Sequence, residues 1–364
     1  MAALKFIKNT SSLNLIKNPT FLLRNANIYN KNILTIDNIL DNDILSLFNL
    51  TDYLKYNDDY NFINFNGKKS LGLLFFEPST RTRMSFELAA KKIGLYTLIE
   101  TNPNQNMSIA KQESLHDTLK TISNYVDGIV LRHPDEKEVF KNIENIDVPI
   151  INAGWGNYGH PTQALIDLYT FKNKFKNLKQ TKLAIVGDPN RRTVKSICKL
   201  ANRLEMPLTI IYPNLYKYQP HNLDYSFNSI IANNKYEFQE AAKEQDILYY
   251  SKFTDDILDN KNDNLFDNYK EQHIQWLAAE HQLVRKNTNN GITQSHNIVH
   301  ETIDNYYLPL SFLEENNVYI YSPLPRHPNE MDKNIDNTKY QLSFEGVKNS
   351  VYIRMALLNL ILND

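Results

Sequence analysis

The sequence predicts an α/β protein of two domains, each built on a parallel sheet flanked by helices. Short apolar runs alternate with longer segments in which apolar residues recur at helical spacing. Such alternation is typical of parallel sheets that carry helices on both faces. The chain has 364 residues, enough for two hydrophobic cores, and a polar, lysine-rich stretch at 172–182 separates the two series.

The first series begins after residues 1–36 with a helix at 37–56, whose apolar residues lie on one face. Its further strands are expected at 71–76, 128–131 and 148–152, and its further helices at 82–93, 114–125 and 161–171. Pro161 opens the last of these helices at a first-turn position that needs no N–H group.

The second series consists of strands, mostly followed by polar turn residues. These strands are expected at 183–186, 208–212, 246–250, 276–279 and 318–321. The segments 256–268 and 285–290 are rich in Asn, Asp and Lys and are expected to be loops. A strongly apolar helix is expected at 347–362. The first turn of this series, at 187–190, lacks the Gly-x-Gly-x-x-Gly pattern, so no dinucleotide site is expected.

The composition narrows the class of protein. A net charge of −1 argues against nucleic acid as the main partner, because no basic field is available to neutralise phosphates. The single cysteine, Cys198, excludes an internal disulfide and fits a reducing compartment. No apolar run approaches the length of a membrane helix. A cytoplasmic protein without a membrane segment is therefore expected.

The N-terminal extension at 1–36 leaves open a second cellular location, an organelle. It contains five basic residues and no Asp or Glu. An acid-free, partly apolar leader of this kind is also typical of an organelle targeting segment. A polar extension ahead of the first helix is the alternative.

A turn rich in hydroxyl groups and arginines connects the strand at 71–76 to the next helix. It reads Ser79-Thr80-Arg81-Thr82-Arg83. The first turn of a helix offers unpaired backbone N–H groups and the positive end of the helix dipole. Hydroxyl donors and planar guanidinium forks add to this cradle, which is suited to a phosphate group.

This turn resembles the carbamoyl phosphate motif of the transcarbamoylases. Further segments follow in the order of that family, so the resemblance covers roughly residues 30 to 360. They are Leu-Arg-His-Pro at 131–134, Val-Pro-Ile-Ile-Asn-Ala-Gly at 148–154, His-Pro-Thr-Gln-Ala-Leu at 160–165, Val-Gly-Asp at 186–188, Arg-Thr-Val at 192–194 and Pro-Leu-Pro-Arg at 323–326. The His-Pro-Thr-Gln form and the Pro-Leu-Pro-Arg loop are similar to the aspartate branch rather than the ornithine branch.

The resemblance implies the domain plan and the reaction. A carbamoyl phosphate-binding domain would comprise 37–172 plus 345–364, because the last helix returns to it in the family, and an acceptor-binding domain would comprise 173–344. The enzyme would transfer the carbamoyl group of carbamoyl phosphate to the amine of L-aspartate, a step of pyrimidine biosynthesis. Orientation and electrostatics dominate such a reaction, and neither cofactor nor metal is expected.

The resemblance also implies the residues that would hold carbamoyl phosphate. Its phosphate would lie in the cradle Ser79, Thr80, Arg81 and Thr82. Its carbonyl oxygen would be bound by Arg132 and His160, and its NH₂ by Gln163 and by the backbone carbonyls of Pro323 and Leu324. Arg81, Thr82, Arg132, His160, Gln163 and Lys111 would be the catalytic residues.

The acceptor side departs from the family pattern. Arg192 matches the family arginine, but Arg191 precedes it and the spacing from Asp188 is one residue shorter, so two registers stay open. Lys252 and Thr254 stand where the family has Arg-x-Gln, and lysine loses the bidentate fork of arginine. Leu324 would complete the aspartate site.

The segment 106–115 resembles the family loop that reaches into the active site of a neighbouring subunit. Lys111 fits its lysine, whereas Met107 stands at the position of its serine and Ser108 is adjacent. The resemblance therefore implies a homotrimer with shared active sites. A regulatory or pathway-enzyme partner is also open.

Two alternatives remain on these residues. One is a transcarbamoylase for another acid-bearing amine, motivated by Lys252 and Thr254. The other is a non-catalytic paralogue that serves as a scaffold or regulatory subunit, motivated by Met107, Lys252 and Ser322, the last of which replaces a usual family histidine.

Overall fold

The protein is described here from a computed structural model of the chain. The model describes residues 26–57, 60–214, 220, 223–251, 304–326 and 331–363. The chain divides into two compact units. Unit 1 takes its residues from Met1–Gln180, Arg191–Met206 and Phe344–Asp364, and unit 2 takes its residues from Thr181–Asn190 and Pro207–Ser343.

Unit 1 is built on a four-stranded parallel sheet with the order β2-β1-β3-β4. Its strands are β1 (Ser70–Phe75), β2 (Tyr96–Glu100), β3 (Gly128–His133) and β4 (Ile150–Trp155). Its helices are α2 (Asp41–Tyr56), α3 (Thr80–Lys92), α4 (Pro103–Asn106), α5 (Leu115–Ser123), α6 (Glu136–Asn142), α7 (Pro161–Lys174), α8 (Arg192–Arg203) and α14 (Ser343–Leu362), with short 3₁₀ turns η2 (Ile36–Asn38), η3 (Asn61–Ile63), η4 (Ser108–Lys111) and η5 (Leu178–Gln180).

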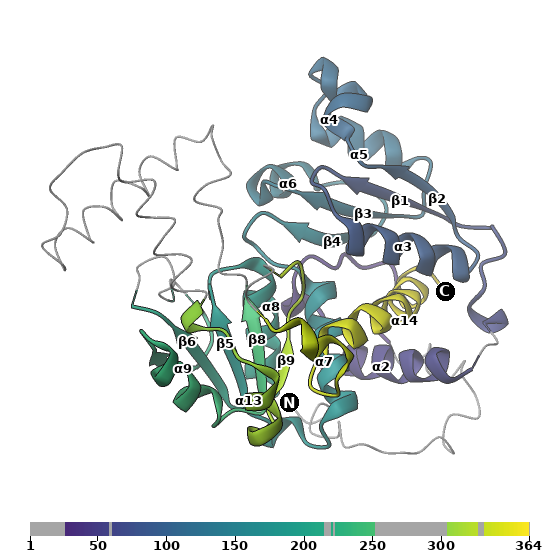
Figure 1. The fold of residues 1–364 in the computed structure, drawn as a ribbon. Coiled ribbons are helices and arrows are strands. Elements are labelled where there is room, and N and C mark those ends of the chain that lie inside the picture. The colour runs from purple at the N-terminus through teal and green to yellow at the C-terminus, as the bar shows by residue number, and fades with distance from the viewer. Residues whose placement is uncertain are drawn as a thin grey trace, which may run out of the picture. The chain divides into compact units, whose positions relative to one another are not determined.

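Helices cover both faces of this sheet (Figure 1). Helices α5 and α6 pack on one face through a cluster that includes Leu119, Val139 and Leu131 of β3. Helix α3 lies on the other side of the sheet, next to α14. The central strands are buried on both faces, which explains why they read as continuous apolar runs.

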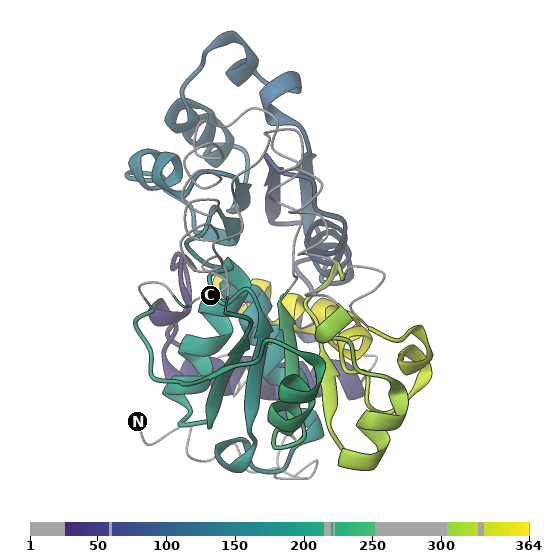
Figure 2. The same ribbon diagram turned by 60° about the vertical axis from the view of Figure 1, so that its left-hand side comes forward.

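A segment made of α4 and η4 stands out from one end of unit 1 in both views (Figures 1 and 2). Met107 and Ile109 fasten it, because they pack against the hydrophobic cluster under α5. Ser108 and Lys111 are exposed on it. The segment therefore presents a hydroxyl group and an ammonium group to the outside of the unit.

Unit 2 is built on a five-stranded parallel sheet with the order β7-β6-β5-β8-β9. Its strands are β5 (Leu183–Gly187), β6 (Leu208–Tyr212), β7 (Asn228–Ile231), β8 (Ile247–Ser251) and β9 (Tyr319–Tyr321). Its helices are α9 (Lys235–Ala242) and α13 (Leu310–Asn316), with the 3₁₀ turn η7 (Lys333–Asn337). Two parallel sheets flanked by helices confirm the predicted fold class.

The structure differs from the prediction in several elements. The helix expected at 37–56 is two elements, η2 and α2, because Leu40 between them is extended and donates its N–H to the side chain of Asp43. Strands β2 and β7 have no counterpart among the predicted elements. The strand expected at 276–279 and the loops at 256–268 and 285–290 lie outside the described residues.

The division of the chain is also more interleaved than expected. The segment Arg191–Met206, expected in the acceptor domain, groups with unit 1. Over the described ranges, no helix is both long enough and apolar enough to cross a membrane.

Candidate active site

The hydroxyl-rich turn after β1 forms the N-terminus of α3, as an anion site requires. Helix α3 begins at Thr80, and its cap residue Ser79 makes no side-chain hydrogen bond to the helix. The first-turn N–H groups and the Ser79 hydroxyl therefore remain available to a ligand. Thr82 is buried beneath this turn.

The two arginines of this turn have different surroundings. Arg81 is exposed, and its guanidinium has no ion-pair partner among the described residues. Arg83 instead donates to Glu87 one turn further along the helix, at 3.0 Å. Arg81 is thus the arginine of this turn that is free to bind an anion.

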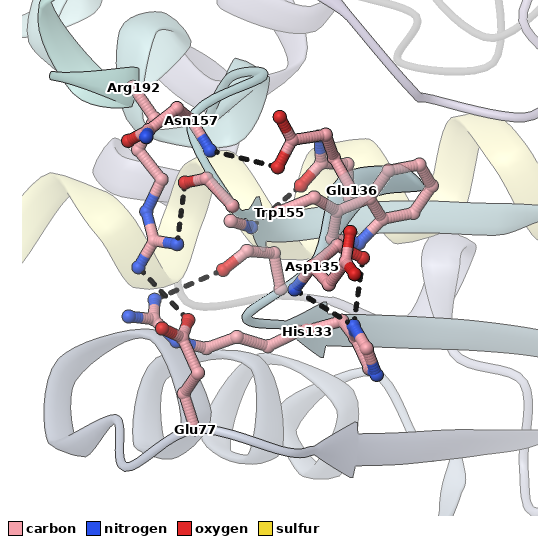
Figure 3. A network of polar contacts seen from close by, with 12 residues as sticks. Glu77, His133, Asp135, Glu136, Trp155, Asn157 and Arg192 are labelled. Carbon is pink, nitrogen blue, oxygen red and sulfur yellow. Dashed lines mark hydrogen bonds and ion pairs between the residues drawn. The ribbon is translucent and has the colours of Figure 1, made fainter. Parts of the chain in front are cut away.

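Two further arginines meet at a single carboxylate, that of Glu77 (Figure 3). Its Oε2 lies 3.2 Å from Nε of Arg132, at the end of β3, and 3.1 Å from Nη2 of Arg192, at the start of α8. The Arg132 approach is an ion pair only, since its Nε has no hydrogen-bond partner among the described residues, whereas Arg192 donates a hydrogen bond. The pKa of Arg132 is lowered to about 10, chiefly by burial and also by the charges of Arg192 and Arg81, while the charge of Glu77 opposes this shift.

Gly154, near the end of β4, is where these groups converge. Its φ of +107° favours glycine. A Cβ atom at this position would lie 3.1 Å from Nη1 of Arg132, 3.3 Å from Nε of Arg192 and 3.3 Å from Cδ2 of His160. The absence of a side chain at Gly154 therefore lets two guanidinium groups and an imidazole approach one point.

His160 is held at the N-terminus of α7. Its backbone N–H donates to Oγ of Ser196 at 2.9 Å, and its side chain is buried. Burial, with the charges of Arg132, Arg192 and Arg354, holds the pKa of His160 well below its usual range. The ring is therefore neutral at physiological pH and can donate one hydrogen bond.

Gln163 lies one turn into α7 and is oriented by Asp167. Nε2 of the amide donates to the buried Asp167 carboxylate at 2.7 Å. A carboxylate only accepts, so the amide nitrogen must face Asp167 and the amide oxygen must face away from it. That oxygen is the acceptor that a carbamoyl NH₂ requires.

A buried cation on α14 lies behind the first turn of α3. The side chain of Arg354 is 2% exposed and donates to Oγ of Ser85, while its guanidinium lies 4.6 Å from the ring centre of Phe86. Ser85 in turn donates to the backbone carbonyls of Arg81 and Thr82. Arg354 thus connects the C-terminal helix to the backbone of the cradle.

The loop between β4 and α7 is fastened on the side away from the arginines (Figure 3). Glu136 accepts the N–H of Asn157 at 3.2 Å, and Nε1 of the buried Trp155 donates to the carbonyl of Leu131 at 2.7 Å. Nη1 of Arg192 donates to the carbonyl of Gly156 in the same loop, at 3.1 Å. The loop therefore helps to position Arg192.

Of the predicted residues, the structure groups Arg132, His160 and Arg192 around Gly154. It favours Arg192 over Arg191 as the arginine of this site, because the guanidinium of Arg192 lies beside Gly154 and Glu77. The other predicted residues either belong to other segments of the described chain or lie outside the described residues. Pro323 and Leu324 lie in the loop after β9 of unit 2, Ser108 and Lys111 lie on η4, and Lys252 and Thr254 are outside the described residues.

Glu77, Asp167 and Ser196 were missed by the sequence reasoning. Glu77 stands between a predicted strand and a turn full of cations, and this position was its signal. Asp167 stands four residues after Gln163 on a predicted helix, a spacing at which side chains meet. Nothing in the sequence pairs Ser196 with His160, because the contact joins residues 36 positions apart.

Comparisons with known proteins identify the relatives of this chain. Residues 31–173 match the family model described as "Aspartate/ornithine carbamoyltransferase, carbamoyl-P binding domain". An aspartate carbamoyltransferase catalytic subunit of Picrophilus torridus is 30% identical over 337 residues, which cover 92% of this chain and 99% of the relative. A ureidoglycine carbamoyltransferase of Rubrobacter xylanophilus is 33% identical, over 78% of each chain.

A solved structure extends the similarity to the fold. The catalytic subunit of the M. jannaschii aspartate transcarbamoylase superposes with a TM-score of 0.71 at 26% identity, covering 92% of this chain and 99% of that one. The chain therefore belongs to the aspartate/ornithine carbamoyltransferase family, and it is a carbamoyltransferase that takes its carbamoyl group from carbamoyl phosphate.

Proposed function

We propose that the acceptor is L-aspartate and that the products are N-carbamoyl-L-aspartate and phosphate, as in pyrimidine biosynthesis. The observation that carries the proposal is the convergence of Arg132, His160 and Arg192 at Gly154. A dianionic acceptor needs cations beyond those that hold the phosphate, and Arg192 is a further cation beside the carbonyl-binding pair. The relative from Picrophilus torridus is named for the same acceptor.

In the proposed reaction, the first turn of α3 and Arg81 bind the phosphate group, and Arg132 and His160 donate to the carbonyl oxygen. The uncharged amine of aspartate attacks the carbonyl carbon, so a C–N bond forms while the C–O bond to phosphate breaks. The phosphate leaves with the bonding electron pair and takes up the proton that the amine releases. Fixed donors at the carbonyl oxygen stabilise the negative charge that develops there.

A neutral His160 suits this role better than a charged one. The site already contains several cations, and a further charge in a buried position would be costly. A neutral imidazole still donates one hydrogen bond to the carbonyl oxygen.

A second acid-bearing amine remains a candidate acceptor. The ureidoglycine carbamoyltransferase relative is 33% identical to this chain, and the aspartate carbamoyltransferase of Picrophilus torridus is 30% identical. Lys252 and Thr254 also depart from the family's acceptor pattern. We rank this candidate below aspartate because relatives from Picrophilus torridus, Buchnera aphidicola, Methanococcus maripaludis and Pisum sativum are all named aspartate carbamoyltransferases. A non-catalytic scaffold ranks lowest, since Arg81, Arg83, Arg132, His160 and Gln163 are all present and a degenerate scaffold has no reason to keep them.

A steady-state assay of carbamoyl phosphate against a panel of amines tests the proposal. The panel contains L-aspartate, ureidoglycine, L-ornithine and L-glutamate, and the readout is phosphate release together with the mass of the carbamoylated product. The highest kcat/KM is expected with aspartate. A higher kcat/KM with another amine would identify that amine as the acceptor in place of aspartate. No turnover with any amine would support the non-catalytic scaffold.

We also propose a homotrimer in which each active site is shared between two chains. Lys111 is exposed on the projecting η4 and has no ion-pair partner among the described residues. An apolar surface on α3 and β2 offers a contact area, comprising Met84, Leu88, Tyr96 and Leu98. Strand β2 is an edge strand, so its outer edge is open to a neighbour.

A further inference from the structure

A buried cation lies behind the turn that binds the phosphate in the proposed function. Arg354 belongs to α14 and is 2% exposed. It contacts two residues of α3, the hydroxyl of Ser85 and the ring of Phe86, whose centre lies 4.6 Å from Cζ of Arg354. Arg354 and α3 both belong to unit 1, so these contacts lie within one compact part of the chain. Burying a guanidinium is costly, so its contacts must compensate for the loss of water.

The chemistry of the two groups determines the direction of the hydrogen bonds at Ser85. A guanidinium group only donates, so Oγ of Ser85 must accept from Nη1 of Arg354. The one hydroxyl hydrogen of Ser85 is then donated to the backbone carbonyls of Arg81 and Thr82, the second of which lies 3.1 Å from Oγ. Two successive hydrogen bonds thus connect the positive charge of Arg354 to the backbone of the first turn of α3.

The carbonyl of Arg81 shares its peptide unit with a donor of the same turn, the N–H of Thr82. Thr82 is the third residue of α3, so its N–H is one of the first-turn groups that the helix itself does not bind. A donor that draws electron density toward a peptide oxygen makes the N–H of that peptide a stronger donor, as in any chain of hydrogen bonds. A charged group at the start of the chain increases this effect. Arg354 and Ser85 therefore strengthen and orient an N–H group that neither of them touches.

The electric field of Arg354 also reaches other parts of the site. Burial is the main cause that lowers the pKa of His160, and the charge of Arg354 adds to it, after the charges of Arg132 and Arg192. A cation fixed at this point attracts an anion at the N-terminus of α3, in the same direction as the helix dipole.

We propose that Arg354 is a positioning residue that acts through Ser85 to hold and polarise the N–H of Thr82 for the phosphate group of the substrate. The inference rests on the proposed function, in which the first turn of α3 binds that phosphate. Arg354 contributes no group to the reaction. Its contribution is a positive charge that the last helix of the chain brings to the cradle from behind, away from solvent.

Binding of inorganic phosphate tests the inference, because this ligand uses the cradle and has no carbonyl group. The measurements are its dissociation constant, by isothermal titration calorimetry of the purified full-length protein, and the melting temperature. The variants are Arg354→Met, which removes the charge, Arg354→Lys, which keeps it, Ser85→Ala, which removes the connection, and the double variant that combines Arg354→Met with Ser85→Ala.

Arg354→Met should weaken phosphate binding by about fivefold to thirtyfold, the range for a partly buried charge at a helix end. Arg354→Lys should bind phosphate more tightly than Arg354→Met, although it loses the planar contact with Phe86 and should also melt earlier than the wild type. Ser85→Ala should weaken phosphate binding as well. The double variant should weaken it by less than the product of the two single effects, because the two residues act in series.

Lys172→Met is the matched control. Lys172 is another largely buried cation of unit 1, on α7, and its side chain is 12% exposed. Its Nζ lies 2.9 Å from Oδ2 of Asp52 and 5.6 Å from the ring centre of Tyr169. Lys172→Met should lower the melting temperature and leave phosphate binding unchanged. Weaker phosphate binding in this control, to the same extent as in Arg354→Met, would contradict the inference, because any damage to the packing of unit 1 would then disturb the cradle.

Three other results would contradict the inference. They are unchanged phosphate binding in Arg354→Met, equal weakening by Arg354→Met and Arg354→Lys, and single effects that multiply in the double variant. If Arg354→Met does not fold, Ser85→Ala decides, because it removes one hydroxyl group only, and unchanged phosphate binding in that variant would also contradict the inference. A failure of the proposed function would give a different result. Arg81→Ala would then leave phosphate binding unchanged, because the cradle would not be the phosphate site.

Discussion

Glu77 is the residue that allows two arginines to lie side by side in this site. Arg132 and Arg192 repel each other, and the negative charge of Glu77 between them offsets that repulsion. The Glu77 carboxylate is 25% exposed, which shields the three charges from most of the solvent. Before substrate binds, Glu77 is the anion that holds both guanidinium groups, and bound substrates would compete for them.

We expect Glu77→Gln to lower kcat/KM by about tenfold to a hundredfold. The amide keeps the shape of the side chain but removes the charge, and a hydrogen bond between charged groups contributes about 1.5–3 kcal/mol. Steady-state kinetics with carbamoyl phosphate and the preferred amine measure the effect. Glu87→Gln is the control, because Glu87 pairs with Arg83 and Lys91 on the outer surface of α3. An equal loss in the two variants would contradict the special role of Glu77.

The neutral state of His160 has a consequence for stability against pH. In the unfolded chain this histidine takes up a proton below about pH 6.5, its ordinary pKa, whereas in the folded chain it stays neutral to much lower pH. The unfolded state then binds more protons, so stability rises with pH. The contribution of His160 is therefore complete above about pH 6.5 and is lost progressively below it.

His160→Gln should remove this part of the pH dependence. Between about pH 6.5 and 5, the free energy of unfolding of the wild-type protein should fall more steeply than that of the variant, by up to about 1.4 kcal/mol per pH unit. Urea denaturation at a series of pH values measures both slopes. Parallel curves for the two proteins would mean that folding does not lower the pKa of His160.

At the scale of elements, the end of β4 determines whether the site can assemble. Strand β4 places Gly154 next to two arginine side chains. Arg132 comes from the carboxyl end of β3, and Arg192 comes from the first residue of α8. Helix α7 follows directly and contributes His160 and Gln163. The carboxyl ends of parallel strands are where ligands bind in open α/β sheets.

We expect Gly154→Ala to reduce activity by at least tenfold and stability by about 1–3 kcal/mol. The new methyl group would contact both guanidinium groups and the imidazole, and φ +107° is strained for alanine. Activity assays and thermal denaturation measure the two effects. Gly72→Ala on β1 is the control, since its methyl group would meet only ordinary contacts, the nearest 3.4 Å away on Ile122. It should change activity far less than Gly154→Ala.

The elements that the sequence predicted correctly share one property, which is burial. Strands β1, β5 and β6 are continuous apolar runs and were predicted within one or two residues. Strands β2 and β7 lie at sheet edges and are largely exposed, so their sequences carry no apolar run to detect. The break between η2 and α2 depends on Asp43 binding the backbone of Leu40, which an apolar pattern does not report.

The residues of the site, like the elements of the fold, were predicted only where the sequence carries a direct signal. The groups predicted for it were those that carry a recognisable motif, such as Arg81 and His160. Glu77 and Asp167 act by holding other side chains in place, and their role depends on three-dimensional proximity rather than on spacing along the chain. Arg354 shows the limit most clearly, because it reaches Ser85 across 269 positions of sequence.

At the scale of the whole molecule, the proposed catalytic residues do not all belong to one region. Arg81, Thr82, Arg132, His160 and Gln163 belong to the body of unit 1, while Lys111 stands on the projecting segment of the same unit. No hydrogen bond or ion pair joins Lys111 to the other catalytic residues within the described part of the chain. A lysine in this position would serve the site of a neighbouring chain.

Mixing two inactive variants tests this arrangement. Arg81→Ala and Lys111→Ala should each be nearly inactive as pure proteins. In a head-to-tail ring, every mixed trimer contains one site with an intact Arg81 on one chain and an intact Lys111 on the next. Random mixing makes about three-quarters of the trimers mixed, each with one good site in three, so about a quarter of wild-type activity should return. Sites that are complete within one chain would give no recovery of activity. The shared-site proposal would be overturned if the mixture stays inactive although mass spectrometry shows that subunits have exchanged.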